Sequence, residues 1–161
     1  MRIYLYFLAI LFGINLPVFS QIIHSDVKSL STNADIILTG KVSEQKSEWN
    51  SDNTRIYTKV TIDVEEYLKG SNGQNKITIT HPGGEVGEVG ELYSHMPRFS
   101  NDEEVLLFVK EDRKTMSYKV LSGEDGKLTL YRDKITGESV TSFNKKVSTI
   151  KREIKNYVEQ Y

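Results

Sequence analysis

The residue types that bind metals or move protons are concentrated between positions 81 and 95. Two of the chain's three histidines and three of its glutamates fall within this stretch. They are His81, Glu85, Glu88, Glu91 and His95. Carboxylate oxygens suit calcium, and mixed nitrogen and oxygen ligands suit zinc. The spacing matches no known ligand pattern, and the helical H-E-x-x-H motif is absent. We therefore predict no metal and no cofactor here.

Sequence patterns for catalysis are also missing. The chain has no G-x-S-x-G motif, and no Lys-Ser/Thr pair follows the glycines after Pro82 as in a phosphate-binding loop. It has no cysteine, which removes thiol nucleophiles and thiolate zinc sites. We predict no catalytic residue and a protein that is not an enzyme. The alternative is a small metal-dependent hydrolase that uses the loop from His81 to His95.

His81 also has a structural interpretation. It continues the alternation of Ile77 and Ile79, which is the period of a strand with one buried face. We expect His81 to lie at the end of that strand, partly buried, with a satisfied hydrogen bond.

The residues that could contact a partner lie in two predicted loops. Residues 81–100 hold two prolines and four glycines without regular periodicity, which indicates a long loop. The chain's single tryptophan precedes the turn cluster at residues 50–53, where an exposed ring could contact a protein or a glycan. The predicted binding residues are Trp49, His81, Glu85, Tyr93, His95 and Phe99.

The elements that position these loops are predicted to be mostly β-strands. Residues 35–42 form an apolar run typical of a strand buried on both faces, and residues 56–64 alternate between apolar and polar side chains. Further strands are predicted near residues 77–80, 105–109, 116–120 and 128–130. Asp125-Gly126 predicts a hairpin turn, and residues 135–142 a further short hairpin.

Helical periodicity is confined to the two ends of the domain. Residues 25–33 predict a short helix or an irregular arm. Apolar residues at helical spacing predict a C-terminal amphipathic helix over about residues 144–160, with Ser142 or Asn144 as its N-cap. No helical pattern lies between the strands. We therefore predict a mainly β fold, a small OB-like β-barrel with a C-terminal helix.

The net charge indicates which class of partner to expect, and the first twenty residues indicate where the protein is located. The net charge is -1, so the chain lacks the basic excess that phosphate binding needs, and we expect no nucleic-acid partner. Residues 1–20 combine Arg2, an apolar run and a small residue at Ser20, which predicts a secretory signal peptide cleaved before Gln21. We expect one domain, residues 21–161, exported to a periplasm or secreted. Without cysteine it has no disulfide and no acylated membrane anchor after cleavage.

Three segments carry a family resemblance: residues 33–42, residues 57–70 with a closing Lys69-Gly70 turn, and residues 103–108. In this order they resemble strands of the netrin-like module, the OB-fold barrel of the tissue inhibitors of metalloproteinases. The same layout, with Pro82-Gly83-Gly84 and a Pro-x-Phe at residues 97–99, resembles an uncharacterised family of bacterial exported proteins.

The resemblance implies an OB-like module that binds a protein partner through loops at one barrel end, either in the cell envelope or outside the cell. The inhibitors chelate the protease zinc through an N-terminal cysteine. The expected N-terminus here is Gln21 and Thr32 precedes the first matching segment, so none of that family's inhibitory residues carries over. A protease inhibitor that lacks this cysteine is a second alternative.

Overall fold

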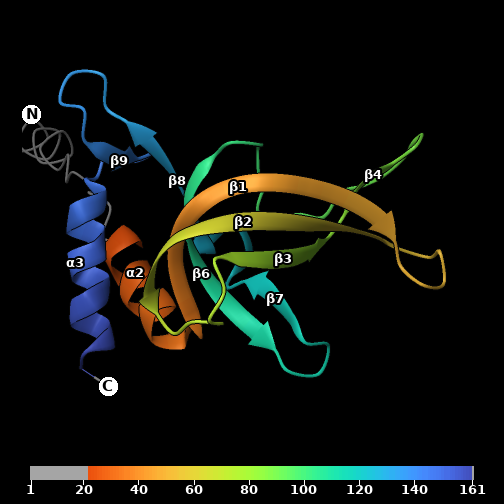
Figure 1. Cartoon of the computed structure of the whole chain (residues 1–161), viewed down its shortest axis with the longest axis horizontal. Helices are drawn as coiled ribbons and strands as arrows, with labels where there is room; N and C mark the ends of the chain where they lie inside the picture. The colour runs from red at the N-terminus through yellow and green to blue at the C-terminus, as the bar shows by residue number, and fades with distance from the viewer. Residues whose placement is uncertain (1–21, 161) are drawn as a thin grey trace, which may run out of the picture.

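The computed structural model describes residues 22–160, which form a mainly β fold with two helices packed at one end (Figure 1). The signal peptide predicted at residues 1–20 lies outside the described residues. The elements are α2 (Ile22–Asn33), β1 (Ile36–Trp49), β2 (Ile56–Lys69), β3 (Lys76–Pro82), β4 (Gly84–Val86), β5 (Val89–Glu91), β6 (Glu104–Asp112), β7 (Ser117–Val120), the 3-10 helix η1 (Gly123–Gly126), β8 (Lys127–Arg132), β9 (Ser139–Thr141) and α3 (Val147–Val158). No helix among residues 22–160 has the length and apolarity needed to cross a membrane.

Seven strands form one sheet in the order β1-β2-β3-β7-β6-β8-β9, and β1 also pairs with β6. Most pairs are antiparallel, but β3 meets β7 in a parallel bridge between Ile79 and Tyr118. Val109 of β6 pairs with both Ile36 of β1 and Val120 of β7, so β1 and β7 lie on opposite edges of β6. These pairings bring the sheet round on itself, and the sheet is partly closed.

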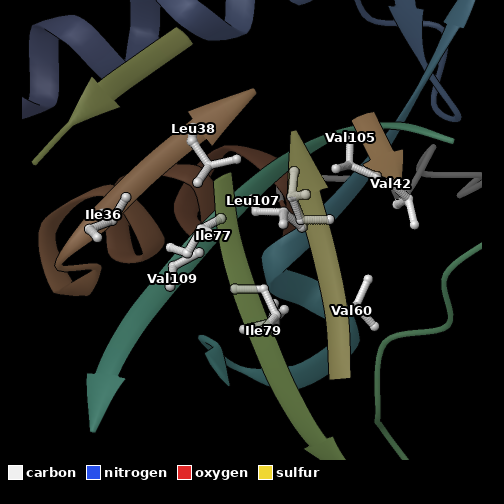
Figure 2. Close-up of a cluster of buried hydrophobic side chains, with 11 residues drawn as sticks. Ile36, Leu38, Val42, Val60, Ile77, Ile79, Val105, Leu107 and Val109 are labelled. Carbon is white, nitrogen blue, oxygen red and sulfur yellow. The ribbon is translucent and has the colours of Figure 1, made fainter. Parts of the chain in front are cut away.

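The apolar run in β1 is buried on both faces because two separate cores meet at this strand. Ile36, Leu38 and Val42 point into the core enclosed by the curved sheet, together with side chains from β2, β3 and β6 (Figure 2). Ile37, between them, points to the other face and joins a second core beneath the helices. The strand therefore has no solvent face where it crosses between the cores, which explains the continuous apolar pattern.

Strand β6 is likewise buried on both faces between the two cores. Val105, Leu107 and Val109 point inward, whereas Leu106 and Phe108 contact the helices on the other face. All five side chains are fully buried.

Helices α2 and α3 lie side by side and cover this outer face of β1 and β6 (Figure 1). Val27 and Leu30 of α2 meet Ile150 and Ile154 of α3 in the second core. The apolar side chains of α3 recur at three and four residues, as the amphipathic pattern predicted.

Helix α3 begins later than the sequence predicted. Its N-cap is Lys146, not Ser142 or Asn144, and no side-chain hydrogen bond caps it. Asn144 is instead held in a tight turn with φ 59°, where its N–H donates to the carbonyl of Thr141. This turn and a bridge between Val140 and Lys146 leave Lys146 extended, so the helix begins only at Val147.

The hairpin predicted at Asp125-Gly126 does not form. Strands β7 and β8 lie end to end on the same edge of β6, so they pair with β6 and not with each other. Helix η1 links them, and a Cβ at Gly126 would lie 1.9 Å from the carbonyl oxygen of Leu121. The glycine is therefore needed for a close backbone approach and not for a hairpin turn.

The predicted long loop at residues 81–100 contains a small hairpin. Strands β4 and β5 pair through Glu85–Gly90 and Val86–Val89 contacts, with Gly87 in the turn at φ 62°. The hairpin is too short for alternating side chains to be recognised in the sequence.

Candidate functional site

A cleft of about 790 Å³ lies where the β1–β2 hairpin, the end of β3, the β4–β5 hairpin and the following loop meet. Its lining includes Ser47, His81, Glu85, Tyr93, Met96 and Phe99. Four of the six predicted binding residues therefore share this cleft. The other two, Trp49 and His95, do not line it.

Cross-strand pairing aligns three polar side chains at the cleft. Ser47 of β1 pairs with Thr58 of β2, and Thr58 pairs with His81 of β3. Directly paired residues project to the same face of a sheet. The row therefore continues the inward-facing positions of Ile77 and Ile79 and ends the apolar core with polar groups.

The glycines after Pro82 pack directly on this row. The Thr58 hydroxyl donates a 2.7 Å hydrogen bond to the carbonyl oxygen of Gly83, and the Ser47 and Thr58 hydroxyls are 2.9 Å apart. Since Thr58 uses its proton on Gly83, Ser47 is the donor between the two hydroxyls. A Cβ on Gly84 would lie 2.3 Å from Thr58 Oγ1 and 2.4 Å from Ser47 Oγ. Only glycine fits, so the Gly-Gly pair fastens the β4–β5 hairpin to the sheet.

His81 is half-buried near the end of β3, as its spacing predicted. Its ring stacks on Phe99 with centroids 6.2 Å apart and planes inclined by 24°. Nδ1 donates to the carbonyl oxygen of Pro82 at 3.1 Å, because a carbonyl can only accept. Burial lowers the pKa of His81, and the bond to Pro82 offsets this only in part. The neutral ring therefore keeps an unprotonated Nε2, which can accept a hydrogen bond from a ligand.

Phe99 also contacts an ion pair that the sequence did not predict. Lys127 Nζ lies 5.2 Å from the centre of the Phe99 ring and 2.6 Å from Glu103 Oε1. The two charged side chains are only 10% and 12% exposed. Glu103 also accepts hydrogen bonds from the Thr129 hydroxyl and the Ser100 N–H.

These contacts set the charge of Glu103. Burial alone would raise its pKa, but the hydrogen bonds from Lys127, Thr129 and Ser100 lower it below the ordinary value. Glu103 is therefore ionised and structural. The partners are far apart in the sequence, so no local pattern predicts the pair.

Tyr93 is held in place by two charged residues. Its hydroxyl accepts a hydrogen bond from Arg55 Nη1 and donates one of 3.1 Å to Glu91 Oε2. The Arg55 guanidinium also lies 5.9 Å from the centre of the Tyr93 ring. The aromatic ring is thereby presented at the cleft in a defined orientation. Leu92 beside it is 82% exposed.

His95 serves the site through its backbone. Its side chain is exposed, and its carbonyl oxygen accepts a 2.9 Å hydrogen bond from the N–H of Glu124. A Cβ on Gly123 would lie 2.0 Å from that oxygen, so glycine is required there. These contacts dock the loop onto η1. The cleft thus contains one of the two candidate imidazoles, and the side chains described at residues 27–160 include no group of three or more His, Asp or Glu arranged to hold a metal.

Trp49 is half-buried at the last position of β1, paired with Ile56. It adjoins the turn at residues 50–53, as predicted, but lies outside the cleft lining.

Among the cleft residues that the sequence did not predict, Thr58 had a recognisable signal. It is a polar residue in the buried phase of the alternation between Ile56 and Val60.

Comparison of the chain with models of protein families found no matching family, and comparison with curated proteins found no matching relative. The geometry of the cleft is therefore the basis on which a function can be assigned.

Proposed function

We propose that the protein is an exported, non-enzymatic binding module with an OB-like barrel, and that its cleft binds a protein partner in the cell envelope or outside the cell. Five pairings support the barrel: β1 with β2, β2 with β3, β3 with β7, β7 with β6, and β6 with β1. The OB-fold is a five-stranded barrel that is partly open. The N-terminal sequence pattern supports export.

One observation carries the binding function: the cleft presents an anchored aromatic ring beside an exposed apolar side chain. Tyr93 is fixed by Arg55 and Glu91, so little conformational entropy is lost when a partner packs on it. Leu92 offers apolar area next to the ring. Aromatic anchors surrounded by polar groups are typical of protein-binding surfaces.

The bonding of the polar groups favours binding over catalysis. The Ser47 hydroxyl donates to Thr58, and the Thr58 hydroxyl donates to Gly83, so neither is paired with a base. His81 uses Nδ1 on a backbone carbonyl. A hydrolase that combines His81 with His95 would need His95 in the cleft, where it is not part of the lining. The inhibitor alternative has no separate support in the geometry.

Site-specific photocrosslinking tests the proposal. A photoreactive phenylalanine derivative would replace Leu92 in the tagged full chain, expressed in its own host. The control carries the same group at Ile135, which is 95% exposed in the β8–β9 hairpin away from the cleft. We expect a discrete covalent adduct with one protein from position 92 and not from position 135.

A second variant links the adduct to the cleft. Tyr93→Ala in the position-92 protein should reduce the adduct, whereas Tyr131→Ala, at a tyrosine that is 52% exposed elsewhere, should not. Equal labelling from positions 92 and 135, or no adduct from either, would show that the cleft is not the binding surface.

A further inference from the structure

Strand β1 has an edge that is only partly used. It pairs with β2 along almost its whole length, but with β6 only from Ile36 to Lys41. Val42 adds the last contacts on that side: its N–H donates to Glu103 and its carbonyl accepts from Asp102, both at 2.9 Å. Beyond Val42, no other backbone in residues 22–160 pairs with this edge. Figure 1 shows this part of β1 and β2 as a hairpin arm directed away from the helices.

The pairing pattern identifies which backbone groups face the free edge. At the end of the arm, the N–H of Asn50 donates to the carbonyl of Arg55 at 2.8 Å. Residues in an antiparallel strand alternate between facing one neighbour and facing the other. Glu48 and Lys46 therefore face β2, whereas Trp49, Ser47 and Gln45 face the free edge.

An irregularity in β1 is consistent with this assignment. The register shifts between Val42 and Glu44, which leaves Ser43 as an extra residue. Such a bulge moves the alternation by one position. Val42 faces the β6 side before the bulge, and odd-numbered residues face that side after it. Three N–H and three C=O groups, from Gln45, Ser47 and Trp49, are thus available to another strand.

The sequence of this edge is complementary to itself. If two copies meet antiparallel about Ser47, Gln45 lies opposite Trp49 of the second copy, and all three residues form directly hydrogen-bonded pairs. The same register places Lys46 opposite Glu48 of the second copy, and Glu48 opposite Lys46. Moving the register by two residues in either direction would place Lys46 opposite Lys46 or Glu48 opposite Glu48. Like charges directly opposite each other are destabilising.

The two charged side chains are available for these contacts. Lys46 is 69% exposed, and its Nζ lies 4.0 Å from Glu48 Oε2, at the limit of an ion pair. Glu48 is 37% exposed and also pairs with Lys59 of β2. A lysine of the second copy would therefore meet a carboxylate that is already oriented on this face of the arm.

We propose that the protein self-associates by antiparallel pairing of the free β1 edges of two copies, with Ser47 at the two-fold axis and Lys46 opposite Glu48. This interaction surface adjoins the cleft, because Gln45 and Ser47 also belong to the cleft lining. Self-association is a function beyond the proposed binding of another protein there. The paired segment is short, so the contact belongs to the weak, small-interface class and depends on protein concentration.

Sedimentation velocity on the purified protein, from about 10 µM to about 1 mM, tests this. We expect the wild type to show a monomer–dimer equilibrium. Lys46→Glu and Glu48→Lys should each be monomeric, since each places like charges opposite each other. An equimolar mixture of the two variants should associate again, because only the mixed pair is complementary. The double variant K46E/E48K should also regain association.

Two controls separate this surface from general charge effects. Glu65→Lys and Lys114→Glu change exposed charges outside the arm and should self-associate like the wild type. The fluorescence of Trp49, the chain's single tryptophan, should shift with concentration in the wild type but not in the single variants. A wild type that stays monomeric throughout the range would overturn the proposal. So would a mixture that associates no more than its components, or single variants that associate like the wild type.

Discussion

The hydroxyl of Thr58 donates a 2.7 Å hydrogen bond to the carbonyl oxygen of Gly83, and this bond joins β2 to the backbone that enters the β4–β5 hairpin. Because Thr58 also meets Ser47 and pairs with His81, the bond fixes the position of the hairpin relative to three strands. The cleft is therefore built on the rigid sheet, although much of its lining comes from a loop.

Gly84→Ala should destabilise the protein by about 3 kcal/mol, because φ is 130° and a Cβ would overlap the hydroxyls of Ser47 and Thr58. Gly87→Ala is the matched control in the same hairpin. It has φ 62° but no atom near its Cβ, and we expect a cost of about 1 kcal/mol. Urea unfolding of both variants measures the difference. Equal costs would mean that the contact with the hydroxyls does not hold the hairpin.

Lys127→Met should cost about 2 kcal/mol, because it leaves the carboxylate of Glu103 nearly buried without its cation. Adding Glu103→Gln should recover part of this loss, since the second change removes the unpaired charge. A double-mutant cycle by urea unfolding gives the coupling. Lys41→Met is the control: it breaks an exposed pair with Asp102 and should change stability far less. Simple additivity of the two changes at positions 103 and 127 would contradict the predicted coupling.

Acidification should weaken the fold through His81. Its folded pKa is lowered from 6.5, mainly by burial, so the unfolded chain binds more protons below that pH. The free energy of unfolding should therefore fall as the pH drops below about 6.5, until the folded pKa is passed. His81→Gln should reduce this slope in urea unfolding between about pH 7.5 and 5.5, and His95→Gln, at an exposed site, should retain it. The idea fails if the slope survives in His81→Gln.

Ile37→Ala and Leu38→Ala should each cost about 2–5 kcal/mol, although the two residues are adjacent and point in opposite directions. In a strand with a solvent face, only one of the two changes would be costly. Thr61→Ala, in the alternating strand β2, is a control at a partly exposed position and should have a small effect. Chemical denaturation of the three variants distinguishes a strand between two cores from a half-exposed strand.

The sequence predicted the secondary structure well wherever the burial of side chains recurs regularly along one strand or helix. The alternation in residues 56–64 matches the inward positions Ile56, Val60 and Ile62 of β2. The continuous apolar run of β1 and the helical spacing of α3 were equally informative. Each of these patterns is local, because burial on one face of a strand or helix recurs at a fixed period.

The turn at Asp125-Gly126 shows where local patterns fail. The dipeptide is typical of a hairpin, but β7 and β8 both find their partner in β6. The late start of α3 has a different origin, since the turn at Asn144 and the bridge between Val140 and Lys146 keep the preceding residues out of the helix. Pairing with the distant strand β6 outweighs the local preference at Asp125-Gly126, and pairing with the neighbouring strand β9 does so before α3.

By itself the sequence determined a mainly β fold, a C-terminal amphipathic helix and a group of candidate binding residues around a Gly-rich segment. The tertiary structure alone decided that His81, Glu85, Tyr93 and Phe99 share one cleft, that His95 lies outside it, and that Glu103 meets Lys127. The physical reason is that periodicity records which face of an element is buried. Which residues meet across the sheet depends on strand order and register, and contacts between distant residues set these.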